Sequence, residues 1–161
     1  MKNIFFLILT VVVFSCHSKV DYSPRKINFD RDACFVCNMG LTDQRYNLQA
    51  INKYGEVHWY DDLGCLAEDI RGDGWKKWDG ETAVIWIGDA AKGNVETNWI
   101  DAKKAFYTYG EHTPMGYGYA AHEVKPDGES SFDYVTTLKR IKEGKTMREK
   151  FVKEKKMLNH Q

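Results

Sequence analysis

The order of apolar and polar positions divides the chain into an apolar start, a short polar stretch and a longer mixed remainder. Residues 4–14 are apolar except for Thr10, and a polar stretch with Pro24 follows over 17–29. A run of eleven residues is too short for a membrane-spanning helix, which needs roughly 20. Short apolar runs then alternate with turn residues from position 30 onward, as expected for a packed domain. The pattern therefore predicts a secretory signal peptide and an exported domain.

Within the domain, the pattern changes repeatedly between the strand period and the helix period. The first predicted elements are a β-hairpin over 46–51 and 56–60 and a helix over 63–70, which is capped by Asp61-Asp62 and ended by Gly72. Further strands are predicted over 82–87, 98–100 and 116–122. A helical segment is predicted over 101–109, and a helix that Gly144 interrupts over 132–158. The order strand, strand, helix occurs twice. This order predicts an α+β fold.

Composition narrows the classes of function. The chain has 161 residues, of which 43% are hydrophobic and 14% aromatic, enough to build a packed interior. Its 23 basic residues balance its 23 acidic residues, so no positive field is available to hold nucleic acid. Nucleic acid is therefore excluded as a partner.

The end of the apolar run carries an anchoring signal. Val13-Phe14-Ser15-Cys16 resembles a bacterial lipobox, in which a small residue precedes the cysteine that is acylated. The alternative is a buried strand with an incidental cysteine, but a polar stretch follows at once, as a tether would. We expect a signal peptide over 1–15, a lipidated tether over 16–29, a domain over 30–131 and a charged C-terminal helix or tail over 132–161. Cys16 would then hold the protein on the outer side of a cell membrane, on the periplasmic face in a Gram-negative cell.

Three sulfur atoms lie close together in the segment Cys34-Phe35-Val36-Cys37-Asn38-Met39. Thiolate and thioether are soft ligands, and a mixture of the two favours Cu(I) over zinc. A structural zinc site would need four cysteine or histidine ligands, whereas Cys65 stands apart from the pair. A thioredoxin-like redox pair would need to start a helix, which Asn38 and Gly40 disfavour. Buried or disulfide-bonded cysteines are the third alternative, although three thiols leave at least one unpaired.

A second segment with ligand chemistry is Thr113-Pro114-Met115-Gly116. Methionine is usually a core residue, but proline and glycine keep this one in a turn, where its sulfur can be reached. His58, His112 and His122 are further candidate ligands, each weighed against an ordinary surface role.

The segments 32–43 (DACFVCNMGLTD), 58–69 (HWYDDLGCLAED) and 98–122 (NWIDAKKAFYTYGEHTPMGYGYAAH) together resemble the NosL family. These are lipoproteins that bind Cu(I) and act as accessory proteins in the assembly of nitrous oxide reductase. The resemblance implies an α+β fold of two small ββαβ units that form one compact domain. It matches Cys37 and Met39 to the family's C-x-M pair, and Met115 to its P-M-G methionine.

The chain also departs from the family pattern. Asn38 stands where the family commonly has glycine, and His122 stands where an aromatic residue is common. Cys34 and Cys65 are compatible with the family, with their roles open. His122, Cys34 and Cys65 are therefore additional candidate ligands.

The resulting hypothesis is a membrane-anchored Cu(I) metallochaperone that is not an enzyme. Cys37, Met39 and Met115 would converge on one Cu(I) ion from two loops. By resemblance, the partners would be a copper-donor transporter complex and an acceptor copper enzyme, nitrous oxide reductase or a similar one. The alternatives are a thiol-disulfide oxidoreductase that uses Cys34 and Cys37, and a structural lipoprotein without metal.

Overall fold

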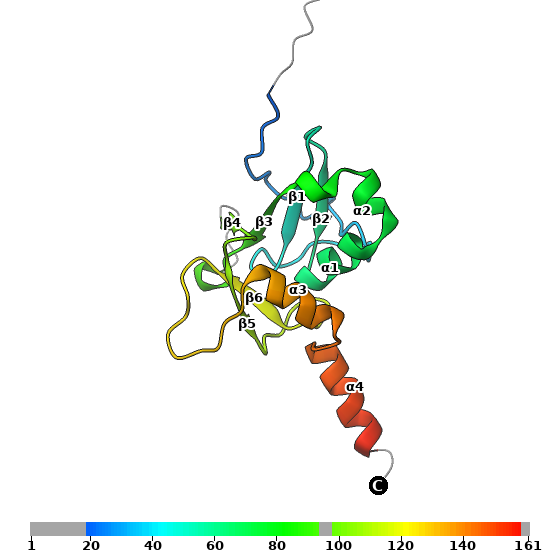
Figure 1. Ribbon diagram of the computed structural model, residues 1–161, viewed down its shortest axis with the longest axis vertical. Coiled ribbons are helices and arrows are strands. Elements are labelled where there is room, and N and C mark those ends of the chain that lie inside the picture. The colour runs from blue at the N-terminus through cyan, green and yellow to red at the C-terminus, as the bar shows by residue number, and fades with distance from the viewer. Residues whose placement is uncertain (1–18, 94–97, 159–161) are drawn as a thin grey trace, which may run out of the picture.

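Two antiparallel β-sheets and a layer of helices form the fold (Figure 1). The computed structural model describes residues 19–93 and 98–158. The first sheet has the order β2-β1-β3-β4, and its strands are β1 (Leu48–Ile51), β2 (Val57–Tyr60), β3 (Val84–Gly88) and β4 (Trp99–Asp101). The second sheet pairs β5 (Phe106–Tyr109) with β6 (Tyr119–His122). The predicted α+β class is confirmed.

Four α-helices accompany the sheets in the described part of the chain. They are α1 (Leu63–Arg71), α2 (Asp73–Lys77), α3 (Tyr134–Lys142) and α4 (Met147–Leu158), with short 3₁₀ turns at Gly80–Thr82 and Ala90–Lys92. The predicted cap is confirmed, since the Asp62 side chain accepts a hydrogen bond from the Gly64 N–H. The predicted interruption of the last helix is also confirmed, because Gly144 takes a positive φ of 72° between α3 and α4.

Strand β1 lies at the centre of the core. All four of its residues are buried, because β2 and β3 pair with it on either side. The predicted hairpin is confirmed by the pairing of Leu48 with Tyr60. The predicted strands over 82–87 and 98–100 pair with each other, since Ile100 lies opposite Ile87. Helix α3 packs on α1 and β5, so the same core joins both sheets. Tyr134 and Ile141 of α3 are buried, which makes the first half of the predicted tail part of the core.

The prediction of a helix over 101–109 is wrong. Residues 102–104 form a turn after β4, in which the Asp101 side chain accepts a hydrogen bond from the Lys103 N–H, and β5 follows. Tyr107 is fully buried and its hydroxyl donates to the Ala102 carbonyl at 2.7 Å. Long-range pairing with β6 therefore overrides the local preference of these residues for helix.

The packed part of the chain begins earlier than residue 30. The Gln49 side chain accepts from the Arg25 N–H at 2.7 Å and donates to the Arg25 carbonyl at 3.0 Å. The Trp86 indole donates to the Tyr22 carbonyl at 2.8 Å. The predicted tether is thus docked on the domain from Tyr22 onward. The predicted signal peptide (1–15) and Cys16 lie outside the described residues, and no helix within the described residues is long and apolar enough to cross a membrane.

Candidate metal centre

The segment with three sulfur atoms forms a tight loop closed by a bridge between Ala33 and Gly40. The Cys34 N–H donates to the Met39 carbonyl at 2.8 Å, and the Asn38 N–H donates to the Cys34 carbonyl at 2.9 Å. Asn38 takes a φ of 58°, a left-handed conformation that asparagine tolerates better than most residues. This backbone explains why glycine or asparagine suits the position. The loop does not begin a helix, so the arrangement expected of a thioredoxin-like pair is absent here.

The second part of the site is the junction between β2 and α1. Strand β2 ends at Tyr60 and α1 begins at Leu63, so only two residues, Asp61 and Asp62, connect them. Both aspartates are buried. Asp61 directly precedes the helix cap Asp62, and its side chain reaches Cys65 in the first turn of α1. The Phe35 N–H donates to the Trp59 carbonyl at 2.7 Å, which fixes the cysteine loop beside this junction.

Four ligand atoms meet where the loop and the junction touch. The sulfur atoms of Cys34, Cys37 and Cys65 and a carboxylate oxygen of Asp61 all lie within 4.8 Å of one another. Asp61 Oδ1 accepts from the Cys65 thiol at 3.3 Å and from the Cys37 thiol at 3.6 Å. We call these four residues the thiol–carboxylate cluster.

The chemistry of the cluster fits a metal ion. Among the described residues, Asp61 forms no salt bridge, and the three cysteines are free of disulfide bonds. A buried carboxylate without a cation is costly unless a positive charge compensates it. A metal ion bound by three sulfurs and one oxygen would supply that charge.

The three thiols differ in their tendency to ionise. The neighbouring Cys65 thiol and backbone N–H groups lower the pKa of Cys34. Burial raises the pKa of Cys37 to about 11, and contact with Cys34 together with burial raises the pKa of Cys65. The protonated thiol is therefore favoured at Cys37 and Cys65 in the metal-free cluster. Thiolate is the form of cysteine that binds a metal ion, so metal binding should release protons.

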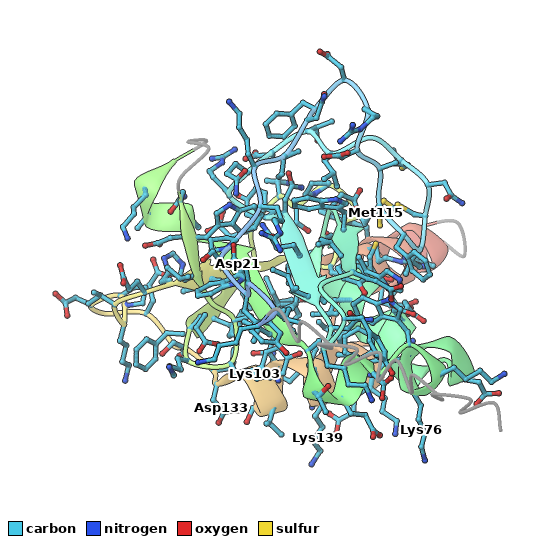
Figure 2. All side chains as sticks on the ribbon, turned by 90° about the horizontal axis from the view of Figure 1, so that it is seen from above. Asp21, Lys76, Lys103, Met115, Asp133 and Lys139 are labelled. Atoms are coloured by element: carbon cyan, nitrogen blue, oxygen red, sulfur yellow. The ribbon has the colours of Figure 1, made fainter. Side chains whose placement is uncertain are left out.

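A third segment, the loop over 113–117, contacts the junction although it is distant from it in the sequence. Asp62 Oδ2 accepts from the Thr113 hydroxyl at 2.5 Å and from the Met115 N–H at 3.1 Å. Gly64 lies under the Tyr117 ring, so close that an added Cβ would stand 2.0 Å from a ring carbon. Burial raises the pKa of Asp62 to about 6, although these hydrogen bonds oppose the shift. The loop over 113–117 is thereby fixed to the residue next to Asp61, and Figure 2 labels Met115 on the side of the molecule where sulfur atoms gather.

The structure places the predicted ligands in three groups. Cys34, Cys37 and Cys65 belong to the cluster. Met39 is 53% exposed on the cysteine loop, and Met115 is half-buried on the loop that Asp62 holds. His122 lies at the end of β6, outside the cluster. Its Nε2 forms a hydrogen bond of 3.0 Å with the Thr108 hydroxyl.

Sequence reasoning missed Asp61 as a candidate ligand, and its treatment of Cys65 as separate from the cysteine pair was wrong, because the structure brings all four residues together. The available signal was the position of Asp61 next to the predicted helix cap, with Cys65 in the first turn of the same helix. The argument against zinc rested on the isolation of Cys65, so that argument no longer holds.

His58 packs against the cysteine loop and is not part of the thiol–carboxylate cluster. Its ring stacks between Phe35 at 3.6 Å and Trp78 at 3.7 Å between ring centroids. Its Nδ1 lies 3.4 Å from a carboxylate oxygen of Asp69, which also accepts from the Tyr60 hydroxyl. Burial lowers the pKa of His58. A neutral ring in this stack holds the cysteine loop against the first sheet.

Comparisons with known proteins agree with the fold. No protein-family model matches the sequence, and no curated protein matches it. Among solved structures, the chain is similar to the crystal structure of the copper chaperone NosL from Shewanella denitrificans, with a TM-score of 0.55 and 15% sequence identity. The match covers 71% of this chain and 95% of that one. At this identity the likeness concerns the fold alone: the chain has a NosL-like fold.

Proposed function

We propose that the protein is a copper-binding chaperone whose cargo is held by the thiol–carboxylate cluster. The observation that carries the proposal is the convergence of four ligand atoms within 4.8 Å. They meet at a junction of a fold shared with a copper chaperone. Binding and release of an ion need no further catalytic group. The protein is therefore proposed as a carrier and not as an enzyme.

The donor set favours a soft ion. Three sulfurs suit Cu(I), and the buried position protects that ion from water and oxidation. Zinc is the second candidate, because three thiolates and a carboxylate make a four-coordinate tetrahedral site. Ligands at the usual zinc–sulfur distance stand about 3.8 Å apart, so the cluster would have to contract by about 1 Å at most. A direct comparison of the two ions decides between them.

The place of action is a further part of the proposal. The lipobox sequence supports a lipid anchor on Cys16 that keeps the carrier outside the cytoplasm at a membrane. Tethering raises the local concentration of the carrier near membrane-bound partners. By its resemblance to the NosL family, the chain would take Cu(I) from a copper-donor transporter complex and deliver it for assembly of nitrous oxide reductase or a similar copper enzyme.

The test is a metal titration of the full chain, purified metal-free under reducing conditions. Cu(I) is supplied in competition with the chelator bicinchoninate, and Zn²⁺ is titrated in parallel. We expect one tightly bound Cu(I) per chain and at least about tenfold weaker binding in the Cys34→Ser/Cys65→Ser double variant. The Cys16→Ser variant is the matched control, because it removes a cysteine that is not in the cluster.

The outcomes separate the candidate functions. Equal Cu(I) binding by wild type and the double variant would refute the cluster as the site. Preferential retention of Zn²⁺ when both ions are offered would assign the site to zinc. Reduction of insulin by the metal-free chain would instead support the oxidoreductase, whereas the absence of metal binding and redox activity would support the structural lipoprotein.

A further inference from the structure

A cavity of about 400 Å³ lies where α3 turns into α4, beside the end of β5. Figure 1 shows that α4 leaves this turn and projects away from the two sheets. The turn has a fixed shape, because Gly144 takes a positive φ of 72° and the buried Thr146 hydroxyl accepts from the Glu149 N–H at 3.3 Å. The cavity is therefore built into the fold, and it shares no residue with the thiol–carboxylate cluster.

The lining of this cavity carries one sign of charge. Four of its residues are basic and none is acidic. Arg140 comes from α3, Lys145 from the turn, and Lys150 and Lys153 from α4. Lys150 and Lys153 are three residues apart, a spacing that puts both on one face of a helix. Cations that converge in this way repel one another, and an anion between them would remove the repulsion. We call this site the basic cavity.

The carboxylates of the protein neutralise only part of this charge. The Lys145 ammonium lies 2.7 Å from a carboxylate oxygen of Glu143, whereas Arg140, Lys150 and Lys153 form no salt bridge within the described residues. The carboxyl end of a helix attracts cations by itself, which explains the basic residues in the last turn of α3. That attraction fades within one turn, so it does not explain Lys150 and Lys153 on the next helix.

Arg140 is held in place and still has free donors. It is half-buried, its Nε donates to the Tyr119 hydroxyl at 3.1 Å, and its guanidinium carbon lies 4.1 Å from the centre of the Phe132 ring. The Tyr119 hydroxyl in turn donates to the Lys145 carbonyl at 2.7 Å, which connects Arg140 to the turn. Within the described residues, the two terminal nitrogens of Arg140 donate no hydrogen bond. A guanidinium held in this way offers paired N–H groups, a geometry that matches the oxygens of a phosphate.

We propose that the basic cavity binds a phosphoryl group. Arg140 binds two of its oxygens, and Lys145, Lys150 and Lys153 supply positive charge around the others. A phosphate monoester carries about 1.5 to 2 negative charges at pH 7, which suits several unneutralised cations better than the single charge of a carboxylate. Inorganic phosphate and the headgroup of an anionic phospholipid both present this chemistry, and the two arms of the experiment distinguish them.

The first arm uses soluble phosphate. The metal-free full chain is titrated with inorganic phosphate and with pyrophosphate, while chloride keeps the ionic strength constant. Backbone amide NMR signals of residues 144–146 report binding at the turn. We expect these signals to shift in a saturable manner if a soluble phosphate is the ligand, with pyrophosphate bound more tightly because it carries more charge.

Three variants connect binding to the basic cavity. Lys150→Gln/Lys153→Gln removes two exposed charges from α4 and should weaken binding by at least about fivefold. Arg140→Lys keeps the charge but loses the paired N–H groups, so it should weaken binding by at least about threefold. Lys76→Gln/Lys77→Gln is the matched control, because it removes the same charge from α2, outside the cavity, and should leave the affinity unchanged.

The second arm presents the phosphoryl group in a membrane. Wild type and the variants are sedimented with vesicles of phosphatidylcholine alone and with vesicles that also contain phosphatidylglycerol. If lipid headgroups are the ligand, phosphatidylglycerol should raise the bound fraction of wild type and of the α2 control. This increase should be lost in the Lys150→Gln/Lys153→Gln variant and at high salt. All variants share the same N-terminal segment, so attachment through that segment cancels in the comparison.

The outcomes are decisive for the basic cavity. Binding in either arm that the cavity variants weaken and the α2 control does not would support the inference and identify the source of the phosphate. No binding in both arms, or equal binding by wild type and the cavity variants, would overturn it. None of the substituted residues belongs to the thiol–carboxylate cluster, so these outcomes leave the proposed copper site untouched.

Discussion

Two junctions, from β2 to α1 and from β6 to α3, begin their helices with the same kind of cap but place it in different environments. Asp62 caps α1 and Asp133 caps α3, each with its side chain on a backbone N–H of the first turn. Asp62 follows β2 after a single residue, whereas residues 123–132 separate β6 from Asp133. Asp62 is fully buried, and Asp133 is exposed. Only the short junction is part of a candidate site.

The comparison shows how connection length decides the environment of a polar group. A two-residue turn between a central sheet and its packed helix leaves no room for its side chains to reach water. The buried carboxylates must then find partners inside the protein. The Asp61 carboxylate accepts hydrogen bonds from two thiols, and the Asp62 carboxylate accepts hydrogen bonds from the loop over 113–117. The long connection lets Asp133 stay in solvent, where it needs no such partners.

The largest expected effect is the difference between Asp62→Ala and Asp133→Ala. Asp62→Ala removes a cap and also leaves the Thr113 hydroxyl and the Met115 N–H without their acceptor. We expect it to lower the free energy of unfolding by about 3–5 kcal/mol. Asp133→Ala should cost about 1 kcal/mol, the value of an exposed cap. Urea denaturation of both variants measures the difference, and equal costs would contradict the importance of the short junction.

The second prediction concerns the close contact of α1 with the Tyr117 ring. Gly64→Ala would force the ring and its loop away from the helix, at a cost of about 1–3 kcal/mol. Gly74 in α2 is the matched control, because an added Cβ there meets no atom within 4 Å. Gly74→Ala should stabilise the protein by up to about 1 kcal/mol. If both substitutions stabilise the fold, the 113–117 loop is not held against α1.

The third prediction tests the conformation of the cysteine loop. Asn38 has a positive φ, so Asn38→Gly should leave the melting temperature nearly unchanged, while Asn38→Val should cost about 1–2 kcal/mol. The melting temperature of the metal-free protein is the measurement. A well-tolerated valine would show that the loop does not need the left-handed conformation.

The smallest effect is a pH dependence. Burial lowers the pKa of His58 in the folded protein, whereas the unfolded chain titrates near the ordinary value of about 6.5. As the pH falls below that value, the unfolded state gains the proton first, so this residue makes the free energy of unfolding decrease. His58→Phe keeps a ring between Phe35 and Trp78 and removes the titration. Its unfolding free energy should therefore fall less steeply than that of wild type between pH 7 and pH 5, and identical slopes would contradict the assignment.

The sequence predicted the parts of the fold that local patterns determine. The hairpin of β1 and β2 follows from alternation around a turn, and α1 follows from its cap and its apolar face. The segment over 101–109 was predicted incorrectly, because its helix-forming residues are outweighed by pairing with β6, and no local pattern carries that information.

The candidate site was predicted in part for a similar reason. The sulfur-rich loop is visible in the sequence because its residues are neighbours. Asp61 was missed because aspartate is usually a surface residue, and its burial depends on the short junction. The approach of Met115 to Asp62 links residues 53 positions apart through one hydrogen bond, a relation that only the folded chain reveals.

The most direct test of the central claim is a copper-edge X-ray absorption spectrum of the full chain loaded with one Cu(I). The account predicts a first shell dominated by sulfur, with fewer sulfur neighbours in the Cys34→Ser/Cys65→Ser variant than in wild type. A first shell of nitrogen and oxygen, or a sulfur shell identical in the two proteins, would contradict copper binding at the junction of β2 and α1.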